Sequence, residues 1–194
     1  MITVDEALTR VFALCQPLGT EHVPLAQAAG RVLAEPARAL RDQPPFPASA
    51  MDGYALRGPA APEQRFRVVG QAPAGHGYTG EVKAGEALRI FTGAPVLDGL
   101  DRVVIQEDVL REGEYISLRA CPDAGANIRA AGQDFRTGDT LSAPRRLRPV
   151  DLALLASMNL AGVSVARRPV VAIIPTGDEL VMPGEEPRAD QIVA

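Results

Sequence analysis

Apolar residues recur every three or four positions over residues 4–15, and this spacing predicts an amphipathic helix. Thr3 and Glu6 form a capping-box pattern at its start, in which each side chain accepts a hydrogen bond from a backbone N–H of the other residue. A second short helix is predicted over residues 26–33. A third is predicted over residues 149–158, where leucines supply the apolar face.

The pattern changes between residues 66 and 141 to short β-type runs separated by glycine and proline, which is typical of a small β domain. The predicted strands cover residues 66–69, 87–91, 103–105 and 115–118. Helical segments lie on both sides of this β-rich stretch. We therefore expect a discontinuous first domain, residues 1–47 with 134–168, into which a β-rich domain of residues 48–133 is inserted.

A continuous apolar run follows at residues 170–174, as in strands that are buried on both faces of a parallel sheet. Such a sheet needs several strands and crossover helices, and the chain ends at residue 194. Residues 169–194 are therefore predicted to begin a truncated α/β domain. The predicted fold class is α+β: a discontinuous helix-containing domain, an inserted β-rich domain, and the first strand of the truncated domain.

Composition narrows the functional classes. The 194 residues are 46% hydrophobic and 23% charged, as in an ordinary globular protein. A net charge of −4 argues against non-specific nucleic-acid binding, and no apolar run approaches the roughly 20 residues that span a bilayer. Cys15 and Cys121 lack metal-ligand spacing and are expected to be buried thiols in a reducing compartment. With no signal-peptide pattern at the start, we expect a cytoplasmic protein.

Four loops carry residues suited to chemistry, and each has a structural alternative. The first loop contains Asp52-Gly53, which is also a common sequence for a tight hairpin turn. In the second loop, the Thr92 hydroxyl and the Gly93 N–H are able to donate to an anion. The alternative for this second loop is a plain turn.

The third loop, residues 125–134, places an amide, a guanidinium and a carboxylate close together in sequence. These groups belong to Asn127, Arg129 and Asp134. A solvated loop is the alternative interpretation. No Ser-His-Asp arrangement, P-loop or dinucleotide-binding fingerprint accompanies these loops.

The fourth loop, residues 175–180, directly follows the apolar run and contains Asp178 and Glu179. In open α/β sheets, ligands bind beyond the carboxyl ends of the strands. Two carboxylates after a Thr-Gly turn at such a place suit a hard cation and a phosphate. A solvated turn is again the alternative.

Together the four loops resemble one family, the molybdopterin molybdenumtransferases, which include the bacterial MoeA proteins and the E domain of gephyrin. The matching blocks are residues 44–55, 89–96 with 103–107, 125–129 with 132–134, and 175–180. They occur in the family's order and cover nearly the whole chain. Pro47-Ala48 departs from the more usual Asp-Asn or Asp-Arg pair, and Gln133 stands where Glu is common.

The resemblance implies an enzyme that converts adenylylated molybdopterin and molybdate into the mature molybdenum cofactor, releases AMP and uses magnesium. It also implies a homodimer of four-domain subunits, with the active cleft between the β-rich second domain of one subunit and the α/β third domain of the other. Most of the third domain and the whole fourth would lie beyond residue 194. We therefore expect this chain to be inactive alone.

The resemblance also assigns residues by position. Those implicated in activity are Asp52, Thr92, Asp134 and Glu179, and those expected to bind substrate are Ser49, Gly93, Asn127, Arg129 and Asp178. Because pyrophosphate cleavage needs charge neutralisation, Glu179 is expected to hold magnesium against phosphate oxygens. Asp52 and Asp134 are expected to bind pterin or ribose groups or to orient a water.

Two alternatives use the same fold without this chemistry. One is a scaffold for protein assembly, and the other is a regulator that binds molybdopterin. The carboxylates retained in the loops favour the enzyme, because a scaffold has no need of them there.

Overall fold

The computed structural model describes residues 2–16, 18–119 and 126–194. The chain divides into two compact units. The larger unit is His22–Val165, and the smaller unit combines the residues up to Glu21 with those from Ala166 onward. No helix among the described residues is long and apolar enough to cross a membrane.

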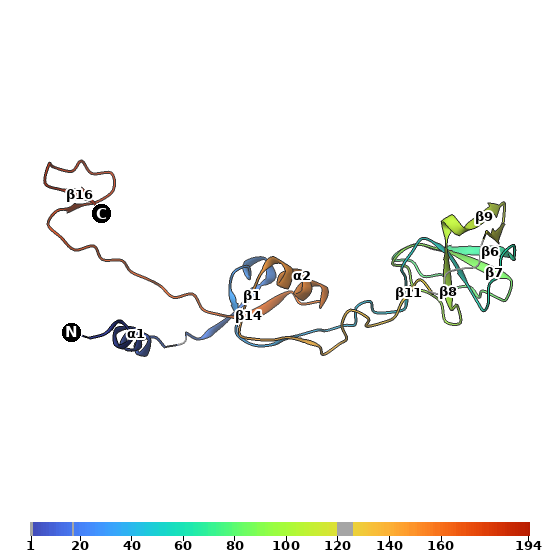
Figure 1. The fold of residues 1–194 in the computed structure, drawn as a ribbon, viewed down its shortest axis with the longest axis horizontal. Helices are drawn as coiled ribbons and strands as arrows, with labels where there is room; N and C mark the ends of the chain where they lie inside the picture. The colour runs from blue at the N-terminus through green and yellow to red at the C-terminus, as the bar shows by residue number, and fades with distance from the viewer. Residues whose placement is uncertain (1, 17, 120–125) are drawn as a thin grey trace. The chain divides into compact units, whose positions relative to one another are not determined.

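A six-stranded sheet forms the β-rich part of the larger unit (Figure 1), in the order β8-β5-β7-β6-β10-β9. Its strands are β5 (Gly53–Leu56), β6 (Arg65–Ala72), β7 (Glu86–Ile90), β8 (Arg102–Ile105), β9 (Val109–Glu112) and β10 (Tyr115–Leu118). A 3-10 turn, η2 (Gln106–Asp108), links β8 to β9. Neighbouring strands are antiparallel, except that β6 and β7 are parallel. All four strands predicted in this region are therefore confirmed.

Both faces of this sheet are covered by apolar side chains. Tyr54 and Leu56 of β5 belong to one buried cluster, which also contains Phe66, while Ala55 belongs to the other, with Leu88. Successive side chains of a strand point to opposite faces. Strand β5 is consequently buried at all four of its positions.

A second sheet has the order β1-β14-β2-β13. Its strands are β1 (Thr20–Pro24), β2 (Val32–Leu33), β13 (Arg145–Arg146) and β14 (Gly162–Ala166), and helix α2 (Pro149–Ser157) joins the last two. Leu155 of α2 packs in one core cluster with Leu33 and Val165. In the first turn of α2, the buried Asp151 accepts from the backbone N–H of Arg148 and from the Arg148 and Arg145 guanidinium groups, and together these lower the pKa of Asp151 to about 2.

Short antiparallel ladders link the two sheets. They pair β3 (Ala37–Arg38) with β12 (Thr140–Leu141), Gln43 with Phe135, and β4 (Ala48–Ser49) with β11 (Ile128–Arg129). The chain before the β-rich stretch thus runs beside the chain that follows it. The domain boundaries 1–47 with 134–168, 48–133 and 169–194 stay predictions.

The smaller unit contains helix α1 (Val4–Ala13) and a parallel pair of short strands, β15 (Leu180–Val181) and β16 (Ile192–Val193). The predicted capping box is confirmed, because Glu6 N donates to Thr3 Oγ1 at 3.2 Å and Thr3 N donates to Glu6 Oε2 at 2.9 Å. No residue of α1 is buried, and Cys15 beyond it is exposed. The prediction of a buried Cys15 is therefore wrong, and Cys121 lies outside the described residues.

Two predicted elements are wrong. Residues 26–33 form no α-helix: a 3-10 turn, η1 (Leu25–Gln27), leads to Gly30 in the left-handed region at φ 71° and then to β2. Residues 170–174 form no strand, and Val170 is 100% exposed. An apolar run becomes a buried strand only when neighbouring strands pair with it, and no described strand pairs with this run.

Candidate functional site

The first three loops meet through backbone hydrogen bonds around β4. Ser49 N donates to Ala94 O at 2.9 Å, and Gly93 N donates to Ser49 O at 2.9 Å. On the other side, Ala50 N donates to Asn127 O at 2.9 Å, next to the β4–β11 ladder. Loops separated by about 40 residues in sequence are thus joined directly in space.

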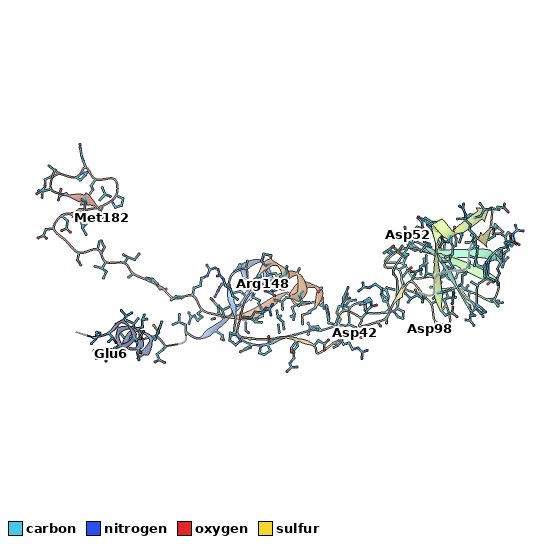
Figure 2. All side chains as sticks on the ribbon, viewed as in Figure 1. Glu6, Asp42, Asp52, Asp98, Arg148 and Met182 are labelled. Atoms are coloured by element: carbon cyan, nitrogen blue, oxygen red, sulfur yellow. The ribbon has the colours of Figure 1, made fainter. Side chains whose placement is uncertain are left out.

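Asp52 and Thr92 form the central contact of the site. Thr92 donates twice to Asp52 Oδ1, from its backbone N at 2.8 Å and from Oγ1 at 2.7 Å. The backbone bond, then the hydroxyl bond, and then the positive charge of Arg89 lower the pKa of the Asp52 carboxyl, although partial desolvation opposes them. Asp52 therefore remains ionised at neutral pH, with one carboxylate oxygen fixed. Figure 2 labels Asp52 beside the six-stranded sheet.

Gly53 owes its place to a close approach of strands. A Cβ atom at this position would lie 2.0 Å from the carbonyl oxygen of Val104 on β8, so only glycine fits. Strand β5 pairs with β7 and β8, whereas β4 pairs with β11. The hairpin interpretation of Asp52-Gly53 is therefore wrong, because the strands on its two sides do not pair with each other.

The third loop places its three predicted residues in different roles. Arg129 forms an ion pair with Asp134, with 2.5 Å between Nη2 and Oδ1. Asn127 has a left-handed backbone, φ 50°, and its side-chain amide donates to Val103 O at 2.9 Å. The Asn127 amide is thus engaged in holding the loop on β8. Gly125 lies outside the described residues.

A pocket of about 390 Å³ opens where these loops meet. It is lined by Arg41, Gln43, Pro44, Pro45, Phe46, Ala48, Ser49, Ala50, Thr92, Gly93 and Arg129. The lining contains two guanidinium groups and no carboxylate. Four of the predicted site residues, Ser49, Thr92, Gly93 and Arg129, are among the eleven.

The predicted anion donors of the second loop are engaged within the protein. The Thr92 hydroxyl and N–H both donate to Asp52, and the Gly93 N–H donates to Ser49 O. The buried Ser49 hydroxyl donates to Met51 O at 2.7 Å. In this arrangement, Arg129 is paired with Asp134, whereas the Arg41 guanidinium has no hydrogen-bond partner among the described residues. The substrate-binding roles of Ser49, Thr92 and Gly93 stay predictions.

Asp178 and Glu179 belong to the smaller unit, so the structure describes them separately from the other three loops. Both side chains are exposed, and the Glu179 backbone carbonyl accepts from Ile192 N at 2.7 Å beside β16. The parts of the chain that the structure describes contain no group of three or more His, Cys, Asp or Glu that could hold a metal ion. Two adjacent exposed carboxylates nevertheless suit magnesium, which usually takes one or two carboxylates plus substrate phosphates.

Sequence reasoning missed Arg41 and Arg89. Arg89 stacks on Tyr54 and Phe91, with its Cζ atom 5.0 Å and 4.6 Å from the ring centroids, and donates to Gly53 O at 3.1 Å. It therefore holds the strand that follows Asp52. The outward position of Arg89 within an alternating strand is a feature of the sequence from which its role could have been predicted. Nothing in the local sequence distinguishes Arg41.

The comparisons with known proteins agree with these features. Residues 2–159 match the family model described as the MoeA N-terminal region, domains I and II. A molybdopterin molybdenumtransferase of Haemophilus influenzae is 38% identical over 99% of this chain and 48% of its own length. One from Bacillus subtilis is 37% identical over 93% of this chain and 44% of its own.

A solved structure shows the same likeness. The molybdopterin biosynthesis MoeA protein of Pyrococcus horikoshii superposes with a TM-score of 0.82 at 38% identity, over 96% of this chain and 52% of that one. The chain thus spans about half the length of these relatives. In the part of the chain that the structure describes, two α-helices and a larger number of strands fit the α+β class. The chain therefore belongs to the MoeA family and corresponds to its N-terminal region.

Proposed function

We propose that the complete protein inserts molybdate into adenylylated molybdopterin and releases AMP. The observation that carries this proposal is the meeting of three sequence-distant loops, with Asp52, Arg129 and Asp134, around one pocket. Cleaving a phosphoanhydride needs positioning and charge neutralisation more than a covalent catalyst. The curated relatives are named molybdopterin molybdenumtransferases, which supports molybdenum cofactor biosynthesis as the pathway.

Asp52 is the residue whose environment best suits a direct role. Its Oδ1 is held by two donors from Thr92, which leaves Oδ2 to accept from a pterin N–H, a ribose hydroxyl or a water. Thr92 then acts by positioning Asp52. Asp134 orients Arg129 through their ion pair, so that the guanidinium faces the pocket in a fixed place.

Magnesium is part of the proposal, with Glu179 as its protein ligand and Asp178 beside it. When bound, the ion would neutralise phosphate oxygens of the substrate. The residues of this chain would hold the ion. Homodimerisation and action in the cytoplasm belong to the same proposal.

The proposal is tested by assaying the complete protein and this 194-residue chain with adenylylated molybdopterin and molybdate. We expect the complete protein to form the molybdenum cofactor and AMP, and the chain alone to show no turnover, because it spans about half of its relatives. Absence of product from the complete protein would contradict the proposed activity. Turnover by the chain alone would show that the site needs nothing beyond residue 194.

The exchange Glu179→Gln in the complete protein is expected to lower turnover at limiting magnesium by about 10- to 100-fold. Glutamine keeps the size of the side chain and removes the charge that a hard cation requires. Turnover should be measured across a magnesium titration, together with the melting temperature. Glu186→Gln is the matched control, since Glu186 is also exposed in the same unit. An unchanged magnesium dependence would rule out Glu179 as the ligand.

A further inference from the structure

Arg41 is the uncompensated cation of the pocket. Its side chain lines the pocket and is exposed, and its guanidinium forms no ion pair or hydrogen bond with any residue that the structure describes. Arg129, the other lining arginine, is paired with Asp134. The pocket therefore carries a net positive charge that comes from Arg41.

The neighbouring carboxylate, Asp42, stays ionised but lies outside the pocket lining and forms no ion pair with Arg41. Asp42 accepts from Thr137 N at 2.7 Å and from Thr137 Oγ1 at 2.8 Å, and these two bonds lower the pKa of the Asp42 carboxyl. Asp52, on the loop beside the pocket, is likewise held by Thr92. Asp42 and Asp52 thus each accept two hydrogen bonds from one threonine.

The backbone next to Arg41 is anchored to the segment that carries the third loop. Asp134 N donates to Gln43 O at 2.8 Å, Gln43 N donates to Phe135 O at 2.9 Å, and Gly132 N donates to Pro44 O at 2.8 Å. These bonds place Arg41 and the Arg129–Asp134 pair on neighbouring segments of the chain. An ordered backbone reduces the entropy that a long side chain loses when it binds a ligand.

We propose that Arg41 binds a tetrahedral oxyanion, a phosphate or molybdate group, in this pocket together with Arg129. A guanidinium carries five N–H donors in a planar fork that matches oxyanion geometry, and the Thr92 and Gly93 donors are already engaged. The inference rests on the proposed function for the identity of the substrate, but anion binding itself is measurable without turnover. Arg41 would thus determine where the anionic part of the substrate docks.

The test is isothermal titration of this chain with inorganic phosphate and, separately, with molybdate at low ionic strength. Charge-assisted hydrogen bonds are roughly twice as strong as neutral ones, so we expect Arg41→Gln to weaken binding by about tenfold or more. Arg41→Lys should keep part of the affinity, because it restores the charge without the fork. Arg146→Gln, which makes the same charge change at an exposed residue outside the pocket lining, should leave the affinity unchanged.

Each outcome decides the proposal. Loss of affinity for phosphate alone assigns the pocket to a phosphate group of the substrate, and loss for molybdate alone assigns it to molybdate. The inference is overturned if the wild-type chain binds neither anion. It is also overturned if Arg41→Gln binds the anions as tightly as the wild-type chain does. If the complete protein is active and Arg41→Gln leaves the KM for both substrates unchanged, the anion-binding inference is overturned and the proposed function stands. If the complete protein is inactive but the chain binds anions through Arg41, the proposed function fails and anion binding stands.

Discussion

Replacement of Asp52 by Asn is expected to reduce turnover of the complete protein by about 100-fold or more, within the range typical of a positioned acid–base group, while the fold stays intact. Asn retains an Oδ1 atom that can accept both bonds from Thr92. It removes the negative charge and replaces the free carboxylate oxygen by an NH₂ donor. The loss should therefore appear in kcat and not in the melting temperature.

Asp98→Asn is the matched control for this measurement. Asp98 is exposed and lines a separate pocket, and it is labelled with Asp52 in Figure 2. The control should change neither turnover nor stability. Near-normal kcat in Asp52→Asn would show that Asp52 only holds the Thr92 loop in place, and a large fall in melting temperature would make its role structural.

Gly53→Ala is expected to destabilise the larger unit by about 3 kcal/mol, at the upper end of the usual cost of overpacking. The added Cβ would meet Val104 O at 2.0 Å and Val104 C at 2.9 Å. Relief requires β5 to separate from β8, yet β5 is buried at all four positions and is paired on both edges. Urea denaturation followed by circular dichroism measures the loss.

The control for this exchange is Gly77→Ala, since a Cβ at Gly77 meets only Pro95 Cγ at 3.4 Å. We expect it to retain nearly the wild-type midpoint. If Gly53→Ala also unfolds at the wild-type midpoint, β5 must be able to move away from β8 without loss. The close approach of β8 would then not be the reason why glycine occupies position 53.

The local sequence was sufficient where short-range interactions decide the structure. The spacing of apolar residues predicted α1, α2 and the strands β6, β7, β8 and β10, and the Thr3–Glu6 pattern predicted the capping box. The four loop blocks identified the family. Helix periodicity, strand alternation and caps depend on residues only a few positions apart, so the sequence alone carries this information.

Contacts between distant residues decided the rest. Residues 170–174 have a strand pattern but pair with no strand that the structure describes, and Asp52-Gly53 has a turn sequence although β5 pairs with β7 and β8. The bonds from Thr92 to Asp52, and the lack of a partner for Arg41 among the described residues, also follow from how loops meet. Residue types and spacing thus determined the family and the candidate loops. Only tertiary structure decided which donors are engaged and which cation is free, because a group's hydrogen-bond partners depend on the packing of segments that lie far apart in sequence.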